Sequence, residues 1–134
     1  MKRINTICKV VLIILGLAFL NTAIQAIVNP QATMDFVEVV LGNVSAKSSI
    51  RSFYGGVNLA FAIFMIYGAF KDQKTALTIS ALYCSGFAFG RFYSLAAEGM
   101  PSSFVITWMV LETFLAALSW YLLAQKKKPE MVKH

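Results

Sequence analysis

Long apolar runs separated by short polar breaks dominate the sequence. A bilayer core about 30 Å thick is crossed by about 20 mostly apolar residues in a helix. The pattern predicts four transmembrane helices, at about residues 7–28, 50–70, 76–97 and 103–124. Tight turns join the second run to the third and the third to the fourth, so these neighbours are antiparallel. The predicted fold is all-α: one domain over residues 1–134, built as an antiparallel four-helix transmembrane bundle.

The only long connection is the predicted outer loop, residues 29–49, which follows the helix stop Asn29-Pro30. Between Met34 and Val44, apolar and polar residues alternate at near-helical spacing. A short amphipathic helix on the outer headgroup layer fits this pattern. An ordinary loop packed over the mouth of the bundle fits it equally well. Residues 125–134 are predicted to form a solvated cytoplasmic tail.

The first apolar run also resembles a signal peptide, because it follows Met1-Lys2-Arg3. A cut after Ala26 would place the bulky Ile24 three residues before the cleavage site, where small residues are preferred. We therefore expect the run to be retained as a membrane helix.

Composition points to the same class of protein. Hydrophobic residues make up 58% of the chain and charged residues only 13%, against about 45–50% and about 25% in soluble domains. The net charge of +6 does not indicate nucleic-acid binding, because the basic residues stand at the ends of the apolar runs and form no recognition motif. We expect a multi-pass membrane protein that contacts the lipid bilayer. We expect no nucleic-acid partner.

The distribution of Lys and Arg predicts the orientation in the membrane. If both termini are cytoplasmic, nine basic residues lie on the cytoplasmic side, and only Lys47 and Arg51 lie on the other. Cytoplasmic loops carry an excess of Lys and Arg, so this bias predicts one fixed orientation with both termini inside.

Two ionisable side chains fall deep inside the predicted spans. Arg91 lies about 9 Å from the outer end of the third span, and Glu112 about 14 Å from the same face, at helical rise. A charge at such depth costs a few kcal/mol or more unless it has a partner. The two spans are neighbours in sequence, so we predict that Arg91 and Glu112 form a buried ion pair or share one polar pocket.

Other polar and small residues occupy the outer half of the same bilayer. Arg51, Tyr54 and Asn58 share a helix face or edge in the second span. The residues expected to support the pocket are Asn21, Gln25, Gly55, Gly56 and Gly90. Together they predict a polar pocket that opens outward. Each group also has a purely structural alternative. The Asn and Gln amides can form hydrogen bonds that hold neighbouring helices together, and Gly86 and Gly90 can allow close helix packing. Arg51 can extend its side chain to the lipid headgroups.

The residues that most enzymes use are scarce. His134 is the only histidine and lies at the terminus, the two cysteines form no CxxC motif, and there is no phosphate-binding glycine loop. We expect no metal, no cofactor and no enzymatic activity.

Several short motifs carry a family resemblance. Arg51-Ser52-Phe53-Tyr54-Gly55-Gly56, Gly90-Arg91, Glu98-Gly99-Met100-Pro101 and Glu112 occur together. The chain resembles, from about Val10 to Leu123, small bacterial four-helix membrane proteins catalogued as a domain of unknown function and DoxX-like in build. The resemblance implies a four-helix bundle in the bacterial inner membrane and no established activity. It places Arg51, Tyr54, Gly55, Gly56, Gly90, Arg91 and Glu112 at a shared site.

Three functions are compatible with this pattern. In the first, the pocket binds a small amphipathic ligand such as a lipid, a quinone or a fatty acid, and Arg91 and Arg51 attract its anionic or carbonyl end. In the second, the chain is a small proton-coupled transporter that uses Glu112. In the third, it is an accessory or assembly subunit of a larger membrane complex. A homo-oligomer is compatible with all three.

Overall fold

A computed structural model describes residues 2–127, and every regular element in that range is a helix. The helices are α1 (Lys2–Val28), α2 (Pro30–Asp35), α3 (Val44–Ile50), η1 (Arg51–Val57), α4 (Asn58–Lys71), α5 (Gln73–Glu98) and α6 (Ser103–Lys127). Residues 128–134, most of the predicted cytoplasmic tail, lie outside the described residues. The rest of the predicted tail, residues 125–127, belongs to α6.

Three helical stretches are long and apolar enough to cross a membrane: Lys2–Val28, Val44–Lys71 and Ser103–Lys126. The second of these joins α3, η1 and α4 into one continuous helix. This confirms the expectation of an all-helical chain with helices long and apolar enough to span a membrane. Three of the four expected spans fall in these helices, and the expected span 76–97 lies in α5, which is not among them. The 26 residues of α5 extend about 39 Å, but α5 is richer in polar residues than the other three.

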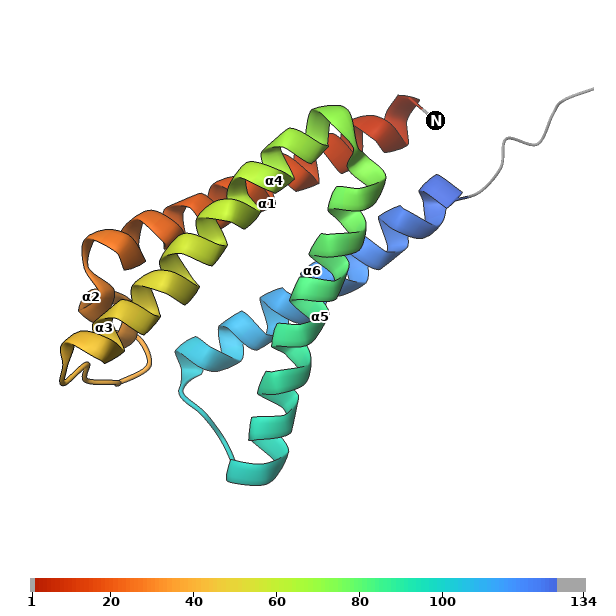
Figure 1. Ribbon diagram of the computed structural model, residues 1–134. Coiled ribbons are helices and arrows are strands. Elements are labelled where there is room, and N and C mark those ends of the chain that lie inside the picture. Colours follow the sequence, from red (N-terminus) through yellow and green to blue (C-terminus); the bar gives the residue numbers. More distant parts are fainter. Residues whose placement is uncertain (1, 128–134) are drawn as a thin grey trace, which may run out of the picture.

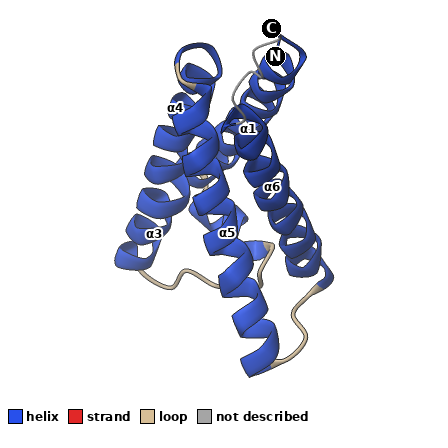
Figure 2. Ribbon diagram, turned by 90° about the vertical axis from the view of Figure 1, so that its right-hand side faces the viewer, coloured by secondary structure: helices blue, strands red, loops and turns tan. Residues whose placement is uncertain are grey.

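The long helices form two antiparallel pairs (Figure 1). The first pair is α1 with η1–α4, and the second pair is α5 with α6. The two pairs meet where the N-terminus, the α4–α5 turn and the end of α6 lie, and they diverge toward the opposite end (Figure 2). We call these the closed end and the open end.

The best-packed core lies at the closed end. A cluster of buried side chains joins α1, α4, α5 and α6 there: Cys8, Leu12, Met65, Ala69, Ala76, Leu77, Leu122 and Leu123. Two hydrogen bonds tie α5 to α6, between the Ser80 and Ser119 hydroxyls at 3.1 Å and from Trp120 Nε1 to Ser85 Oγ at 3.1 Å. The hydrogen bonds fasten α5 to α6 within their pair, the buried cluster holds the two pairs together, and the open end is left free to diverge.

Side-chain caps determine where several helices begin. Asp72 Oδ1 accepts a hydrogen bond from the Thr75 amide at 3.1 Å and thereby caps the start of α5. Hydrogen bonding from the Thr75 side chain first, and then from the Thr75 amide, lowers the pKa of the Asp72 carboxyl below its usual range. Asn43 caps α3 in the same way, through the Ala46 amide at 2.8 Å.

The outer connection differs from the predicted amphipathic helix. The helix does not form between Met34 and Val44, because α2 ends at Asp35 and α3 begins only at Val44. Instead the loop is packed: the Gln31 side chain accepts a hydrogen bond from the Leu41 amide at 2.8 Å and donates one to the Val39 carbonyl at 3.0 Å. The connection is therefore a loop held together by Gln31, and it is shorter than predicted.

Candidate functional site

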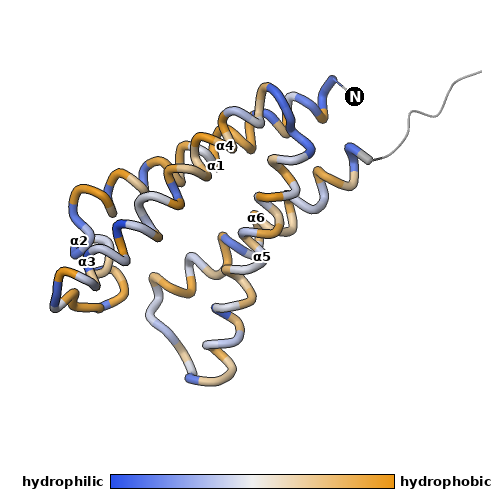
Figure 3. The backbone as a smooth tube through the Cα atoms, viewed as in Figure 1, coloured by the Kyte–Doolittle hydropathy of each residue, from blue (hydrophilic) through white to orange (hydrophobic). Residues whose placement is uncertain are grey.

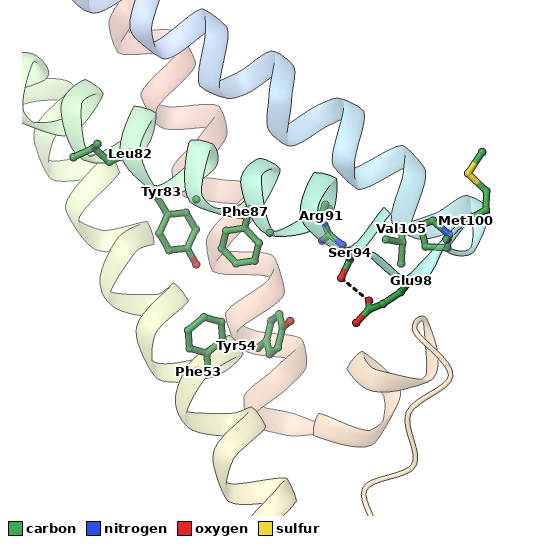
Figure 4. A pocket seen from close by; sticks show the side chains of 14 residues that line it. Phe53, Tyr54, Leu82, Tyr83, Phe87, Arg91, Ser94, Glu98, Met100 and Val105 are labelled. Atoms are coloured by element: carbon green, nitrogen blue, oxygen red, sulfur yellow. Dashed lines mark hydrogen bonds between the residues drawn. The ribbon is translucent and has the colours of Figure 1, made fainter. Parts of the chain in front are cut away.

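A cleft of about 770 Å³ lies at the open end and separates η1 from α5. Its lining comes from η1, from one face of α5, from the α5–α6 turn and from the start of α6 (Figure 4). The lining residues are Phe53, Tyr54, Leu82, Tyr83, Gly86, Phe87, Gly90, Arg91, Ser94, Glu98, Gly99, Met100, Pro101 and Val105.

Arg91 and Glu112 form the predicted ion pair. Arg91 Nε donates to Glu112 Oε2 at 2.5 Å, and Arg91 Nη2 donates to Glu112 Oε1 at 3.0 Å. The side chains are 25% and 13% exposed, so the pair is largely shielded. Arg91 lines the cleft, and Glu112 holds it from α6. Both carboxylate oxygens are occupied, and the guanidinium is fixed in orientation.

Aromatic rings line the inner part of the cleft from two sides. Figure 4 shows Phe53 and Tyr54 on η1 opposite Tyr83 and Phe87 on α5. The Tyr83 hydroxyl donates to Asn58 Oδ1 at 2.7 Å. Asn58 is buried and does not line the cleft, contrary to the prediction. Its amide instead holds Tyr83 at the cleft wall.

At the mouth, near the α5–α6 turn, polar Ser94 and Glu98 line the cleft beside apolar Met100, Pro101 and Val105. Ser94 Oγ donates to Glu98 Oε2 at 2.8 Å, so the Glu98 carboxylate is drawn back along α5 toward Arg91. Among the side chains of residues 2–126, the Arg91–Glu112 pair is the only salt bridge, and Glu98 contacts no basic side chain. The cleft is therefore lined by aromatic rings in its inner part, and its mouth carries the Glu98 carboxylate, which has no basic partner.

Arg51 does not lie in this cleft, so its predicted place beside Arg91 is wrong. Its Nε donates to the Ile27 carbonyl at 3.1 Å, and it lines a separate depression with Ser48 and Gly56. The last four carbonyls of a helix lack partners within the helix. Ile27 lies in the final turn of α1, and its free carbonyl draws the long Arg51 side chain away from the cleft.

Asn21 and Gln25 are exposed and do not line the cleft, so their predicted supporting role is wrong. α1 packs against its neighbours through Ala23 and Ala26, which are fully buried. Successive helix residues are about 100° apart, so Asn21 and Gln25, each two positions from Ala23, point to the far side. Helical spacing correctly predicted that Asn21 and Gln25 lie on the same side of α1. It could not show whether that side faces the other helices or the surroundings.

The glycines divide into two groups. A Cβ at Gly55 would lie 2.7 Å from Ile27 Cγ1, so Gly55 permits close contact between η1 and α1. A Cβ at Gly56, Gly86 or Gly90 would meet nothing within 4 Å. The interpretation of Gly86 and Gly90 as a close-packing motif is therefore wrong. They leave open space in the cleft that they line.

Sequence reasoning missed several residues of the cleft, although a signal for them existed. Along α5, the lining residues recur every three or four positions: Tyr83, Phe87, Gly90, Ser94 and Glu98. This spacing defines one helix face. Following that face from Arg91 in both directions would have found the aromatic wall and the polar residues of the mouth.

Comparison with known proteins gives one result. No curated protein and no solved structure matches the chain. A family model described as a domain of unknown function (DUF4345) matches residues 7–123. This range includes every residue that lines the cleft. The predicted resemblance to a family of unknown function is confirmed, and the chain belongs to the DUF4345 family.

Proposed function

We propose that α1, α3–η1–α4, α5 and α6 all cross the bacterial inner membrane as a four-helix domain, with both termini cytoplasmic. Basic residues at the closed end support this orientation: Lys2, Arg3, Lys9, Lys71, Lys74 and Lys126. Figure 3 marks that end as hydrophilic. The open end, with Lys47 and Arg51, then faces outward, and the cleft lies in the outer half of the bilayer.

Within this frame we propose that the cleft binds a small amphipathic or lipid-like ligand. The observation that carries the proposal is the order of the lining, with aromatic rings inside and Arg91, Ser94 and Glu98 toward the mouth. Ligand sites are mostly apolar clefts of about 300–1,000 Å³ with a few polar groups that orient the ligand. An apolar tail or ring would lie between Tyr54 and Phe87, with its polar end at Arg91.

Arg91 retains hydrogen-bonding capacity for such a ligand. A guanidinium has five N–H donors, of which two are used on Glu112. The remaining donors can bind a phosphate, carboxylate or carbonyl oxygen. Glu112 acts as a positioning residue, because its two oxygens fix the plane of the guanidinium.

The geometry favours binding over the two chemical alternatives. Protonation of Glu112 would break at least one of its bonds to Arg91, which disfavours a transporter that exchanges protons there. Because the same contacts engage both oxygens of Glu112, we propose no role for it as a catalytic base.

The test is mass spectrometry of small molecules that co-purify with the protein in mild detergent. We expect an amphipathic molecule with the wild type and a several-fold lower amount with Arg91→Ala. Arg51→Ala is the matched control, because it removes the same kind of side chain outside the cleft, and it should retain the molecule. Equal recovery from the wild type and Arg91→Ala would overturn the proposal.

One observation favours a second candidate, the accessory or assembly subunit. Asn21 is exposed among the apolar side chains Leu17, Ile24 and Val28 of α1. An amide in lipid gains about 0.6–2 kcal/mol from a hydrogen bond to a neighbouring helix. In this role, α1 docks on a partner helix. Native mass spectrometry should then show a larger assembly for the wild type that Asn21→Leu dissociates, and a monomer for both would exclude it.

A further inference from the structure

The charges around the cleft restrict which amphiphile it can hold. Arg91 is neutralised by Glu112, Arg51 is turned away to the Ile27 carbonyl, and Glu98 stands at the mouth. Counted over Arg91, Glu112 and Glu98, and leaving out Arg51 because it lies outside the cleft, the site carries one net negative charge. A ligand with a net negative charge would therefore meet repulsion there, although Arg91 still offers donors to one anionic group.

We propose that the cleft takes a zwitterionic, amine-headed phospholipid, with its phosphate at Arg91 and its ammonium group at Glu98. This inference rests on the proposed ligand-binding function and names the ligand class for the same site.

The positions of the two charged side chains suit such a headgroup. Figure 4 shows Arg91, Ser94 and Glu98 one after another along α5. Ser94 lies about one helical turn beyond Arg91. Its hydroxyl donates a 2.8 Å hydrogen bond to the Glu98 carboxylate and so holds that carboxylate nearer to Arg91. The guanidinium and the carboxylate are thus one to two turns apart, roughly 5–10 Å. A phosphate and an ammonium group joined by two carbons can reach both.

The groups on each side match the two ends of the headgroup chemically. Arginine binds phosphate through parallel N–H donors, and Glu112 leaves part of that donor set free. Glu98 Oε1 has no hydrogen bond to the described residues and can accept one from an ammonium group. The aromatic walls at Tyr54 and Phe87 then receive the first part of an acyl chain.

Native mass spectrometry can test the headgroup preference directly. The purified protein is exchanged into detergent with equal amounts of an ethanolamine-headed and a glycerol-headed phospholipid that carry the same acyl chains. We expect the wild type to retain about fivefold more of the ethanolamine-headed lipid, the factor that a partly exposed ion pair supplies. Glu98→Gln should abolish this preference and still retain lipid.

Glu38→Gln is the matched control. It removes the same charge from the segment after α2, outside the cleft, and should keep the preference of the wild type. Equal or greater retention of the glycerol-headed lipid by the wild type, or an unchanged preference in Glu98→Gln, would overturn the inference. Retention of neither lipid by any variant would instead overturn the proposed binding function.

Discussion

At the scale of single residues, the Arg91–Glu112 pair couples the stability of the protein to its site. Removing one partner leaves the other charge largely shielded and unpaired, which in fully buried pairs costs about 3–5 kcal/mol. Because Arg91 is 25% exposed, we expect a smaller cost of about 1–3 kcal/mol for Arg91→Met or Glu112→Met. Thermal unfolding in detergent measures this loss.

The double variant separates pairing from packing. Arg91→Met with Glu112→Met leaves no unpaired charge, so its loss of stability should be clearly smaller than the sum of the two single losses. Strict additivity would mean that the two side chains do not interact, and would contradict the observed bidentate contact.

The cleft glycines allow a second prediction at this scale. A Cβ at Gly86 meets nothing within 4 Å, and leucine has a higher helix propensity than glycine by roughly 0.5–1 kcal/mol. Gly86→Leu should therefore keep or raise the unfolding temperature while its side chain fills the cleft and reduces ligand retention several-fold. Unfolding and mass spectrometry on the same sample measure both effects.

Gly16→Ala is the contrasting variant, because its Cβ would lie 2.6 Å from Ile66 Cγ1. Such overpacking costs about 1–3 kcal/mol, so Gly16→Ala should lower the unfolding temperature. If Gly86→Leu destabilised the protein as much, the space in front of Gly86 would not be open.

The residue-scale predictions succeeded where apolar surroundings impose a constraint. Arg91 and Glu112 lie within long, mostly apolar runs of sequence, where a charge needs a partner, and adjacent helices supply it. Arg51 could not be placed from its position in the sequence, because a free carbonyl at the end of another helix decides where its side chain lies. Glycine spacing likewise could not distinguish a packing contact from an open cleft wall.

At the scale of elements, Asp72 makes the start of α5 sensitive to pH. Hydrogen bonds from the side chain and the amide of Thr75 lower the pKa of Asp72 in the folded state, so its carboxylate contributes stability above the unfolded-state pKa of about 4. This contribution is lost as the pH falls through the lower, folded-state pKa. The stability advantage of the wild type over Asp72→Ala should therefore shrink on acidification from pH 7 to pH 3.

Asp72→Asn provides the control, because asparagine caps helices about as well as aspartate but does not titrate. Unfolding temperatures should show Asp72→Asn losing less stability than the wild type over the same pH range. Parallel losses in both proteins would show that Asp72 does not contribute to the acid response.

Helix ends were predicted best where polar residues interrupt the apolar runs. Asn29-Pro30 ends α1 and Asp72 begins α5, both close to the expected positions. The start of the second span was missed, since the polar residues Ser45, Lys47 and Ser48 suggested a loop where α3 forms. The π-helical turn of η1 was not predicted either. It coincides with the close contact of Gly55 with Ile27, which only tertiary packing creates.

At the scale of the whole molecule, the antiparallel order of neighbouring helices followed from the short turns, but the divergence of the two pairs did not. It depends on where the core forms. Small buried residues such as Ala69 and Ala76 bring the pairs together at the closed end. Aromatic and charged side chains occupy the space between them at the open end, and this difference produces the cleft.

The proposed orientation in the membrane yields the final prediction. Ser45 lies in α3 at the open end and Asn5 lies in α1 at the closed end, and both are exposed. In intact bacteria, a membrane-impermeant maleimide should label Ser45→Cys but not Asn5→Cys, and permeabilisation should make both react. The wild type is the control, because Cys8 and Cys84 are buried. Labelling of Asn5→Cys alone would invert the orientation, and equal labelling of both would indicate dual topology. Either result would contradict the prediction from basic residues and move the cleft away from the outer leaflet.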